Sequence, residues 1–143
     1  MNQWTAHMIK TEIGLPGEAF NVIVGLESRG FIQGTILSQM FGVPFVPVRK
    51  AGKLPGECYS ITYGTEYSQD KCEIQKDGLK PGSKALLVDD LLATGGTLKA
   101  TEDLISQVEG AEVAASYCIF DIPALGGSKL LAKKCVCLVS LED

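Results

Sequence analysis

Apolar and polar positions follow one another in a pattern that predicts strands separated by helices. Apolar runs typical of buried parallel strands occupy residues 20–26, where Asn21 is the one polar residue, and residues 85–88, where the run is unbroken. A short polar or glycine-rich segment follows each run, and apolar residues at helical spacing then continue over residues 32–41 and 97–109. Strands that alternate with helices predict an α/β fold with a mostly parallel, doubly wound sheet.

Weaker patterns predict the remaining elements of a single domain, residues 1–143. Proline at position 47 favours an edge or a bulge for the strand that contains it. A turn near Gly64 joins two alternating runs into a hairpin, and we expect residues 53–75 to form a flexible lid. The expected elements are a helix over 1–13, a strand over 45–48, a hairpin over 58–75, a strand over 113–122, a short helix over 128–134 and a last strand over 135–141.

Candidate chemistry lies where the second apolar run ends. Asp89 and Asp90 follow that run directly, at the end of a parallel strand where ligands of α/β sheets bind. Residues 94–97, Thr-Gly-Gly-Thr, open the next helix, and free N–H groups at a helix N-terminus bind phosphate. Mg²⁺ prefers carboxylate, water and phosphate oxygens. The order therefore predicts a site for a phosphorylated sugar that carries a Mg²⁺-bound diphosphate.

A second strand–loop–helix junction carries an arginine. Arg29 stands between Ser28 and Gly30 directly after the first strand, where its guanidinium suits bidentate contact with phosphate oxygens. The alternative is an exposed surface arginine without a ligand.

The only concentrated basic run is residues 49–56, here called the basic segment. Its cations are Arg49, Lys50 and Lys53, set among two glycines and a proline. We expect this segment to be a mobile loop that closes over an anion and excludes water. A solvated surface run is the alternative.

Composition excludes several classes of function. Thirteen basic and seventeen acidic residues give a net charge of −4, which argues against a general nucleic-acid or membrane surface. Five cysteines, an odd number without C-x-x-C spacing, predict reduced thiols in a cytoplasmic protein. The single histidine, His7, lies in the first helix, far in sequence from these loops, and is expected to have no catalytic role.

The motifs together resemble the type I phosphoribosyltransferase family, in the form typical of its adenine-specific members. Residues 88–97, Val-Asp-Asp-Leu-Leu-Ala-Thr-Gly-Gly-Thr, are similar to the family's motif for phosphoribosyl diphosphate. Further matches occur in the family's order at residues 25–31, 48–55, 63–67, 73–77 and 80–82.

The resemblance implies transfer of a phosphoribosyl group to adenine, which gives AMP and diphosphate, by a homodimer that uses Mg²⁺. Asp89 and Asp90 would contact the ribose hydroxyls and the metal, in part through water. Leu125 would contribute to the adenine pocket. The residues implied to bind phosphoribosyl diphosphate are Glu27, Ser28, Arg29, Asp89, Asp90, Ala93, Thr94, Gly95, Gly96 and Thr97. Those implied to act in catalysis are Glu66, Tyr67, Arg49, Lys50 and Lys53.

One family feature is not found before Trp4, namely a Pro-Gly-(apolar)₂-Phe-Arg-Asp type pattern that forms part of the hood over adenine. An incomplete hood is therefore expected, with slower catalysis because the base is less well positioned. The alternative is a weak or inactive protein that binds phosphoribosyl diphosphate or AMP as a regulator or dimerisation partner. A phosphatase-like use of the acidic pair is the least favoured hypothesis.

Overall fold

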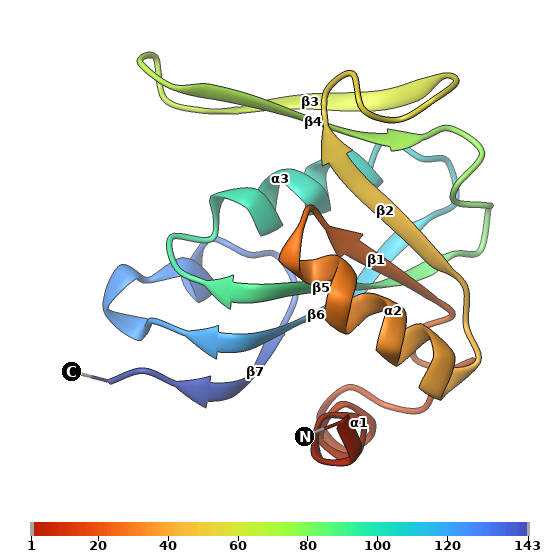
Figure 1. Ribbon diagram of the computed structural model, residues 1–143, viewed down its shortest axis with the longest axis vertical. Helices are drawn as coiled ribbons and strands as arrows, with labels where there is room; N and C mark the ends of the chain where they lie inside the picture. Colours follow the sequence, from red (N-terminus) through yellow and green to blue (C-terminus); the bar gives the residue numbers. More distant parts are fainter. Residues whose placement is uncertain (1, 143) are drawn as a thin grey trace.

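Seven strands form one sheet in the computed structural model, which describes residues 2–142. The strand order is β3-β4-β2-β1-β5-β6-β7, and the five strands from β2 to β7 run parallel (Figure 1). The strands are β1 (Val22–Leu26), β2 (Phe45–Lys50), β3 (Cys58–Gly64), β4 (Gln69–Gln75), β5 (Lys84–Leu92), β6 (Glu112–Asp121) and β7 (Cys135–Ser140). The predicted mostly parallel α/β sheet is confirmed.

Helices cover both faces of this sheet. Helix α2 (Arg29–Phe41) connects β1 to β2, and α3 (Gly96–Ile105) connects β5 to β6. Helix α1 (Asn2–Glu12) packs on the same side as α2, through the buried Ile9. The predicted helix over 1–13 is confirmed within the described part of the chain; Met1 lies outside it. Between residues 2 and 142, no helix is both long enough and apolar enough to cross a membrane.

Two apolar clusters fill the space between helices and sheet. One lies beneath α1 and α2 and includes Ile9, Phe20 and Tyr117; the other lies beneath α3 and includes Leu87 and Leu104. Successive residues of a strand point to opposite faces, so each central strand contributes to both clusters. This is why the central strands appear in the sequence as mostly apolar runs and not as alternating apolar and polar residues.

The hairpin β3–β4 forms as predicted, and its base belongs to the core. Its strands pair antiparallel from Cys58 with Gln75 to Gly64 with Gln69. Cys72 and Ile74 are fully buried against the α3 side of the sheet. The tip at residues 65–68 is exposed, beyond the rest of the sheet at the top of Figure 1.

The basic segment is only partly a loop. Arg49 and Lys50 are the last residues of β2, where they pair with Glu73 and Cys72 of β4, and the loop begins at Ala51. The prediction that all three cations lie in a loop is wrong because β4 extends the sheet along this end of β2. Pro47 pairs with Gly25 of β1 but lies before the part of β2 that pairs with β4. No hydrogen bond to β4 is therefore lost because proline has no N–H.

The predicted short helix over 128–134 is also wrong. Two 3₁₀ turns, Pro123–Leu125 and Gly127–Lys129, occupy this region instead. Residues after them are fixed by Glu102 of α3, whose carboxylate accepts the backbone N–H groups of Ala132 at 3.0 Å and Lys133 at 2.9 Å. A distant carboxylate therefore replaces the local hydrogen bonds that a helix would have made. Helix α3 itself is shorter than predicted and ends at Ile105.

Candidate active site

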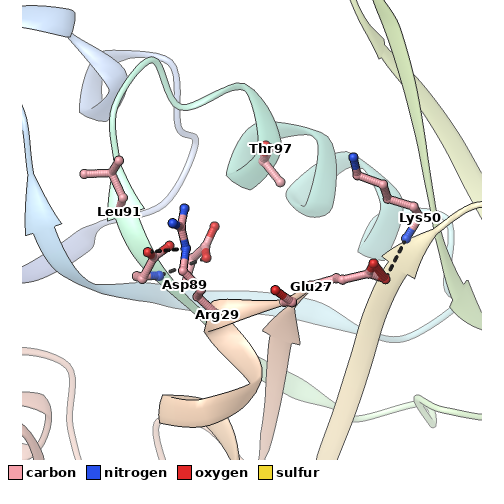
Figure 2. A pocket seen from close by; sticks show the side chains of 8 residues that line it. Glu27, Arg29, Lys50, Asp89, Leu91 and Thr97 are labelled. Carbon is pink, nitrogen blue, oxygen red and sulfur yellow. Dashed lines mark hydrogen bonds and ion pairs between the residues drawn. The ribbon is translucent and has the colours of Figure 1, made fainter.

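The topology places a cleft between β1 and β5. The chain leaves β1 toward α2 on one face and leaves β5 toward α3 on the other, so the two connections diverge. Such a switch point is where open α/β sheets bind ligands. A pocket of about 480 Å³ opens here, lined by Glu27, Ser28, Arg29, Lys50, Asp89, Asp90, Leu91 and Thr97. Figure 2 shows these side chains converging from the turn after β1, the start of α2, β2, β5 and the start of α3.

The acidic pair is divided between the two faces of the sheet. Asp90 points toward α2, where its Oδ2 accepts Arg29 Nε at 2.7 Å. Asp89 points to the α3 face, and its Oδ1 accepts the Asp90 backbone N–H at 2.9 Å. The period of two along a strand imposes this division. One residue of the pair therefore meets the arginine loop while the other faces the glycine-rich loop.

Burial raises the pKa of Asp89 to about 7, and the neighbouring Asp90 carboxylate adds to the rise. The Asp90 backbone N–H and the Arg29 guanidinium act against it, without cancelling it. Asp89 can therefore gain or lose a proton near neutral pH, and a bound cation would favour the charged form.

The glycine-rich loop forms a second, smaller cavity of about 90 Å³ beside the first. Asp89, Leu91 and Thr97 line both cavities, and Ala93, Thr94, Gly95, Gly96 and Leu98 complete the smaller one. Gly95 has φ +84°, and a Cβ there would lie 2.6 Å from the Gly127 carbonyl oxygen, so only glycine fits. Helix α3 starts at Gly96, and a glycine N-cap has no side chain to occupy the N–H groups of its first turn.

A cluster of ion pairs fixes the far wall of the larger pocket. Glu27 accepts Arg49 Nε at 2.8 Å and Lys53 Nζ at 2.9 Å, while the Lys50 backbone N–H approaches at 3.4 Å. Burial by itself raises the pKa of Glu27, but these hydrogen bonds outweigh burial and lower it. Only Lys50 among the three predicted cations lines the pocket, with its side chain directed toward α3 in Figure 2.

Besides Arg49 and Lys53, three more predicted site residues are absent from the lining of both cavities. Glu66 and Tyr67 occupy the exposed hairpin tip, where Tyr67 is 96% exposed. Leu125 lies in the first 3₁₀ turn and is also exposed. Their roles toward the base stay predictions.

Two residues that the sequence patterns did not single out also belong to the site. Leu91 lines both cavities. Tyr63, on β3, packs partly buried against the α3-side cluster, and its pKa is raised mainly by burial. The alternation of β3 places Tyr63 on the inner face with Tyr59 and Ile61, which is the pattern that could have found it.

Within residues 2–142 no three His, Cys, Asp or Glu side chains gather into a cluster that would hold a metal on its own. The donors at this site are the carboxylates of Asp89 and Asp90. Mg²⁺ is commonly held by one or two carboxylates, with waters and substrate phosphates completing its octahedron, so the donor set fits this ion.

Comparison with known proteins agrees with this geometry. Residues 5–140 match the family described as "Phosphoribosyl transferase domain". Over 126 residues the chain is 47% identical to adenine phosphoribosyltransferase of Pseudoalteromonas translucida, covering 88% of this chain and 69% of the relative. The corresponding enzyme of Francisella philomiragia is 49% identical over 127 residues, which are 89% of this chain and 72% of that one.

Solved structures give the same result. The adenine phosphoribosyltransferase of Thermoanaerobacter pseudethanolicus superimposes with a TM-score of 0.87 at 37% identity, over 98% of this chain and 80% of that one. The Saccharomyces cerevisiae enzyme, solved with an imino-altritol bisphosphate and adenine, superimposes with a TM-score of 0.83 at 40% identity. The match covers 95% of this chain and 75% of that one. The Trypanosoma brucei enzyme, solved with AMP, pyrophosphate and ribose-5-phosphate, superimposes with a TM-score of 0.81 at 27% identity. The match covers 97% of this chain and 64% of that one.

Proposed function

Because the chain belongs to the phosphoribosyltransferase family, within its adenine phosphoribosyltransferase branch, we propose that it transfers the phosphoribosyl group of phosphoribosyl diphosphate to adenine. The products are AMP and diphosphate. The observation that carries this proposal is the position of the Asp89–Asp90 pair between an arginine loop and a helix N-terminus. Carboxylates between two anion sites match a sugar that carries phosphate at both ends.

Each part of the site has a role in this reaction. The N–H groups of the 94–97 loop hold the 5′-phosphate, which is favoured at the start of α3. Asp89 and Asp90 hold the ribose hydroxyls and the hydrated Mg²⁺, which stabilises negative charge on the diphosphate when bound. Arg29 and Lys50 flank the leaving diphosphate. Fixed cations lower the barrier because they face charge that develops in the transition state.

The hairpin tip and the base pocket belong to the same proposal. Glu66 and Tyr67 would reach the anomeric carbon only when the tip folds over the cleft, and Leu125 would contact adenine. The packing of Tyr63 and β3 against α3 supports this, since it holds the hairpin beside the start of α3 at the edge of the site. Exposed apolar side chains on α1 and α2, Trp4, Ile32 and Met40, are available to a second copy in a cytoplasmic homodimer.

The test is formation of AMP from labelled adenine, phosphoribosyl diphosphate and Mg²⁺ by the purified chain. We expect AMP to accumulate in proportion to protein and to stop when Mg²⁺ is chelated. Absence of AMP, with phosphoribosyl diphosphate still bound, would reject the transferase and indicate a binding protein instead.

Substitution Asp90→Asn tests the acidic pair directly. It removes one carboxylate from the proposed metal site and the partner of Arg29, so Mg²⁺-dependent binding of phosphoribosyl diphosphate should weaken roughly tenfold or more. Calorimetric titration with and without Mg²⁺ measures this, and a far-UV spectrum equal to that of the parent chain controls for folding. Unchanged titration curves would remove Asp90 from the site.

A further inference from the structure

Three of the five cysteines gather on neighbouring strands at the β7 edge of the sheet. Cys118 of β6 is the register partner of Cys137 of β7, so its side chain lies on the same face of the sheet as those of Cys135 and Cys137. The sulfur atoms of Cys135 and Cys137 lie 3.9 Å apart. All three thiols are free. They face the α3 side of the sheet, and neither cavity of the proposed active site includes them.

We propose that this cluster is a peroxide-sensitive modification site, in which Cys137 is the thiol that reacts and Cys118 is the thiol that closes a Cys118–Cys137 disulfide. The proposal does not depend on the transferase activity.

Exposure distinguishes the two roles. Cys118 is fully buried, whereas Cys135 and Cys137 on the edge strand are only half-buried. A hydroperoxide therefore meets the β7 thiols first. Thiol groups of Cys118 and Cys135 stabilise the negative charge on the Cys137 sulfur, which lowers the pKa of Cys137 and favours the nucleophilic thiolate.

Strand geometry selects the pair that closes. Neighbouring strands are about 4.8 Å apart, and residues two apart on one strand are separated by about 6.6 Å. Disulfides span Cα separations of about 4.4–6.8 Å, most often in the middle of that range. Cys118 and Cys137 thus lie within the range on adjacent strands, while Cys135 and Cys137 stand at its upper limit. In-register residues of parallel strands point to the same face, so a Cys118–Cys137 disulfide needs no change of register.

The chemistry balances with a hydroperoxide as the oxidant. The Cys137 thiolate attacks one peroxide oxygen, an S–O bond forms, the O–O bond breaks, and the departing hydroxide takes up a proton as water. The Cys118 thiol then attacks the resulting sulfenic sulfur. The S–S bond forms, the S–O bond breaks, and hydroxide leaves with the Cys118 proton as a second water. Two thiols are oxidised while one hydrogen peroxide is reduced.

The sequence provides a direct assay. Trypsin cleaves after Lys99, Lys129 and Lys134, so Cys118 lies on the peptide 100–129, while Cys135 and Cys137 share the peptide 135–143. The reduced full-length chain is treated with hydrogen peroxide, alkylated, digested without reductant and analysed by mass spectrometry. We expect the two peptides to be joined, two hydrogens lighter than their sum, and to separate after dithiothreitol. Cys58, whose thiol donates to the Gly56 carbonyl instead, is the internal control and should react about tenfold more slowly.

Matched variants identify the partners. Cys135→Ser should retain the joined peptides, because Cys135 is not in the disulfide. Cys118→Ser should lose them and leave a sulfenic acid on Cys137 that dimedone traps. A disulfide confined to peptide 135–143, loss of the joined peptides in Cys135→Ser, or full alkylation of all three thiols after peroxide would each overturn the proposal. The parent chain and Cys135→Ser decide the matter even if Cys118→Ser does not fold.

Discussion

The carboxyl group of Asp89 has a higher proton affinity in the folded protein than in the unfolded chain. Its pKa is about 7 in the folded protein and 3.8 in the reference state, chiefly because burial penalises the charged carboxylate. A group whose pKa is raised on folding contributes stability at low pH, and this contribution is lost as pH rises through the interval between the two values.

Asp89→Asn should therefore be more stable than the parent chain at pH 8 and equal to it at pH 3.5. We expect the free energy of unfolding of the parent chain to fall by roughly 2–4 kcal/mol relative to the variant between these pH values. Urea titrations across the pH range measure the difference. Asp77→Asn, at an exposed position, is the matched control and should follow the parent chain. Parallel curves for the parent chain and Asp89→Asn would show that Asp89 titrates normally.

Glu27 places a negative charge in a site that binds anions, and its partners explain why. The carboxylate holds Arg49 and Lys53 at hydrogen-bond distance and is only 12% exposed. We propose that it positions these two cations, so that the three-residue cluster keeps a net positive charge beside the pocket. Cations that are already fixed cost no reorganisation when the diphosphate departs.

Glu27→Gln should lower kcat about tenfold and change KM for phosphoribosyl diphosphate less, since the cations remain present but lose their fixed positions. Steady-state kinetics separate the two constants. Glu57→Gln, which removes the exposed partner of Lys76 outside the pocket, should leave both unchanged. A lower KM with unaltered kcat would mean that Glu27 merely repels substrate.

At the scale of elements, parts of the site that follow a strand directly could be predicted from the sequence. Residues 85–97 contain strand, acidic pair, glycine-rich loop and helix start in one stretch, and local patterns specify each of them. The basic segment was misjudged because its strand character comes from pairing with β4, more than twenty residues later. The same reason explains the Glu27 cluster, whose contacts join separate elements and leave no local pattern.

The side chain of Glu102 fixes a segment that has no regular secondary structure. It is 6% exposed and accepts the backbone N–H groups of Ala132 and Lys133, which joins α3 to the segment before β7. Hydrogen bonds to a charged acceptor contribute about 1.5–3 kcal/mol each.

Glu102→Ala should lower the free energy of unfolding by roughly 3 kcal/mol, because two backbone N–H groups lose a charged acceptor. It should also increase hydrogen exchange at residues 130–134 more than elsewhere. Denaturant titration and exchange mass spectrometry measure both effects. Glu109→Ala, at an exposed position just beyond the same helix, is the control and should change little. Equal exchange in the two variants would mean that the segment is held by other contacts.

At the scale of the whole molecule, the two apolar clusters share one sheet. Ile9 and Tyr117 belong to the cluster beneath α1 and α2, and Leu104 to the cluster beneath α3, yet the strands between them supply residues to both. Loss of either cluster exposes the other through the same strands. Because the two clusters depend on the same strands, unfolding should be a single cooperative event.

Ile9→Ala and Leu104→Ala test this cooperativity from opposite faces of the sheet. Both side chains are fully buried, so each substitution should cost about 2–5 kcal/mol through lost burial and the cavity left behind. Because the two positions lack shared contacts across the sheet, the double variant should show the sum of the two losses within about 0.5 kcal/mol. Each variant should still unfold in one transition, with far-UV and near-UV dichroism giving the same midpoint. Two separated transitions in Ile9→Ala, with the α3 side persisting, would show that the faces are independent units and that the site between them can lose one wall while keeping the other.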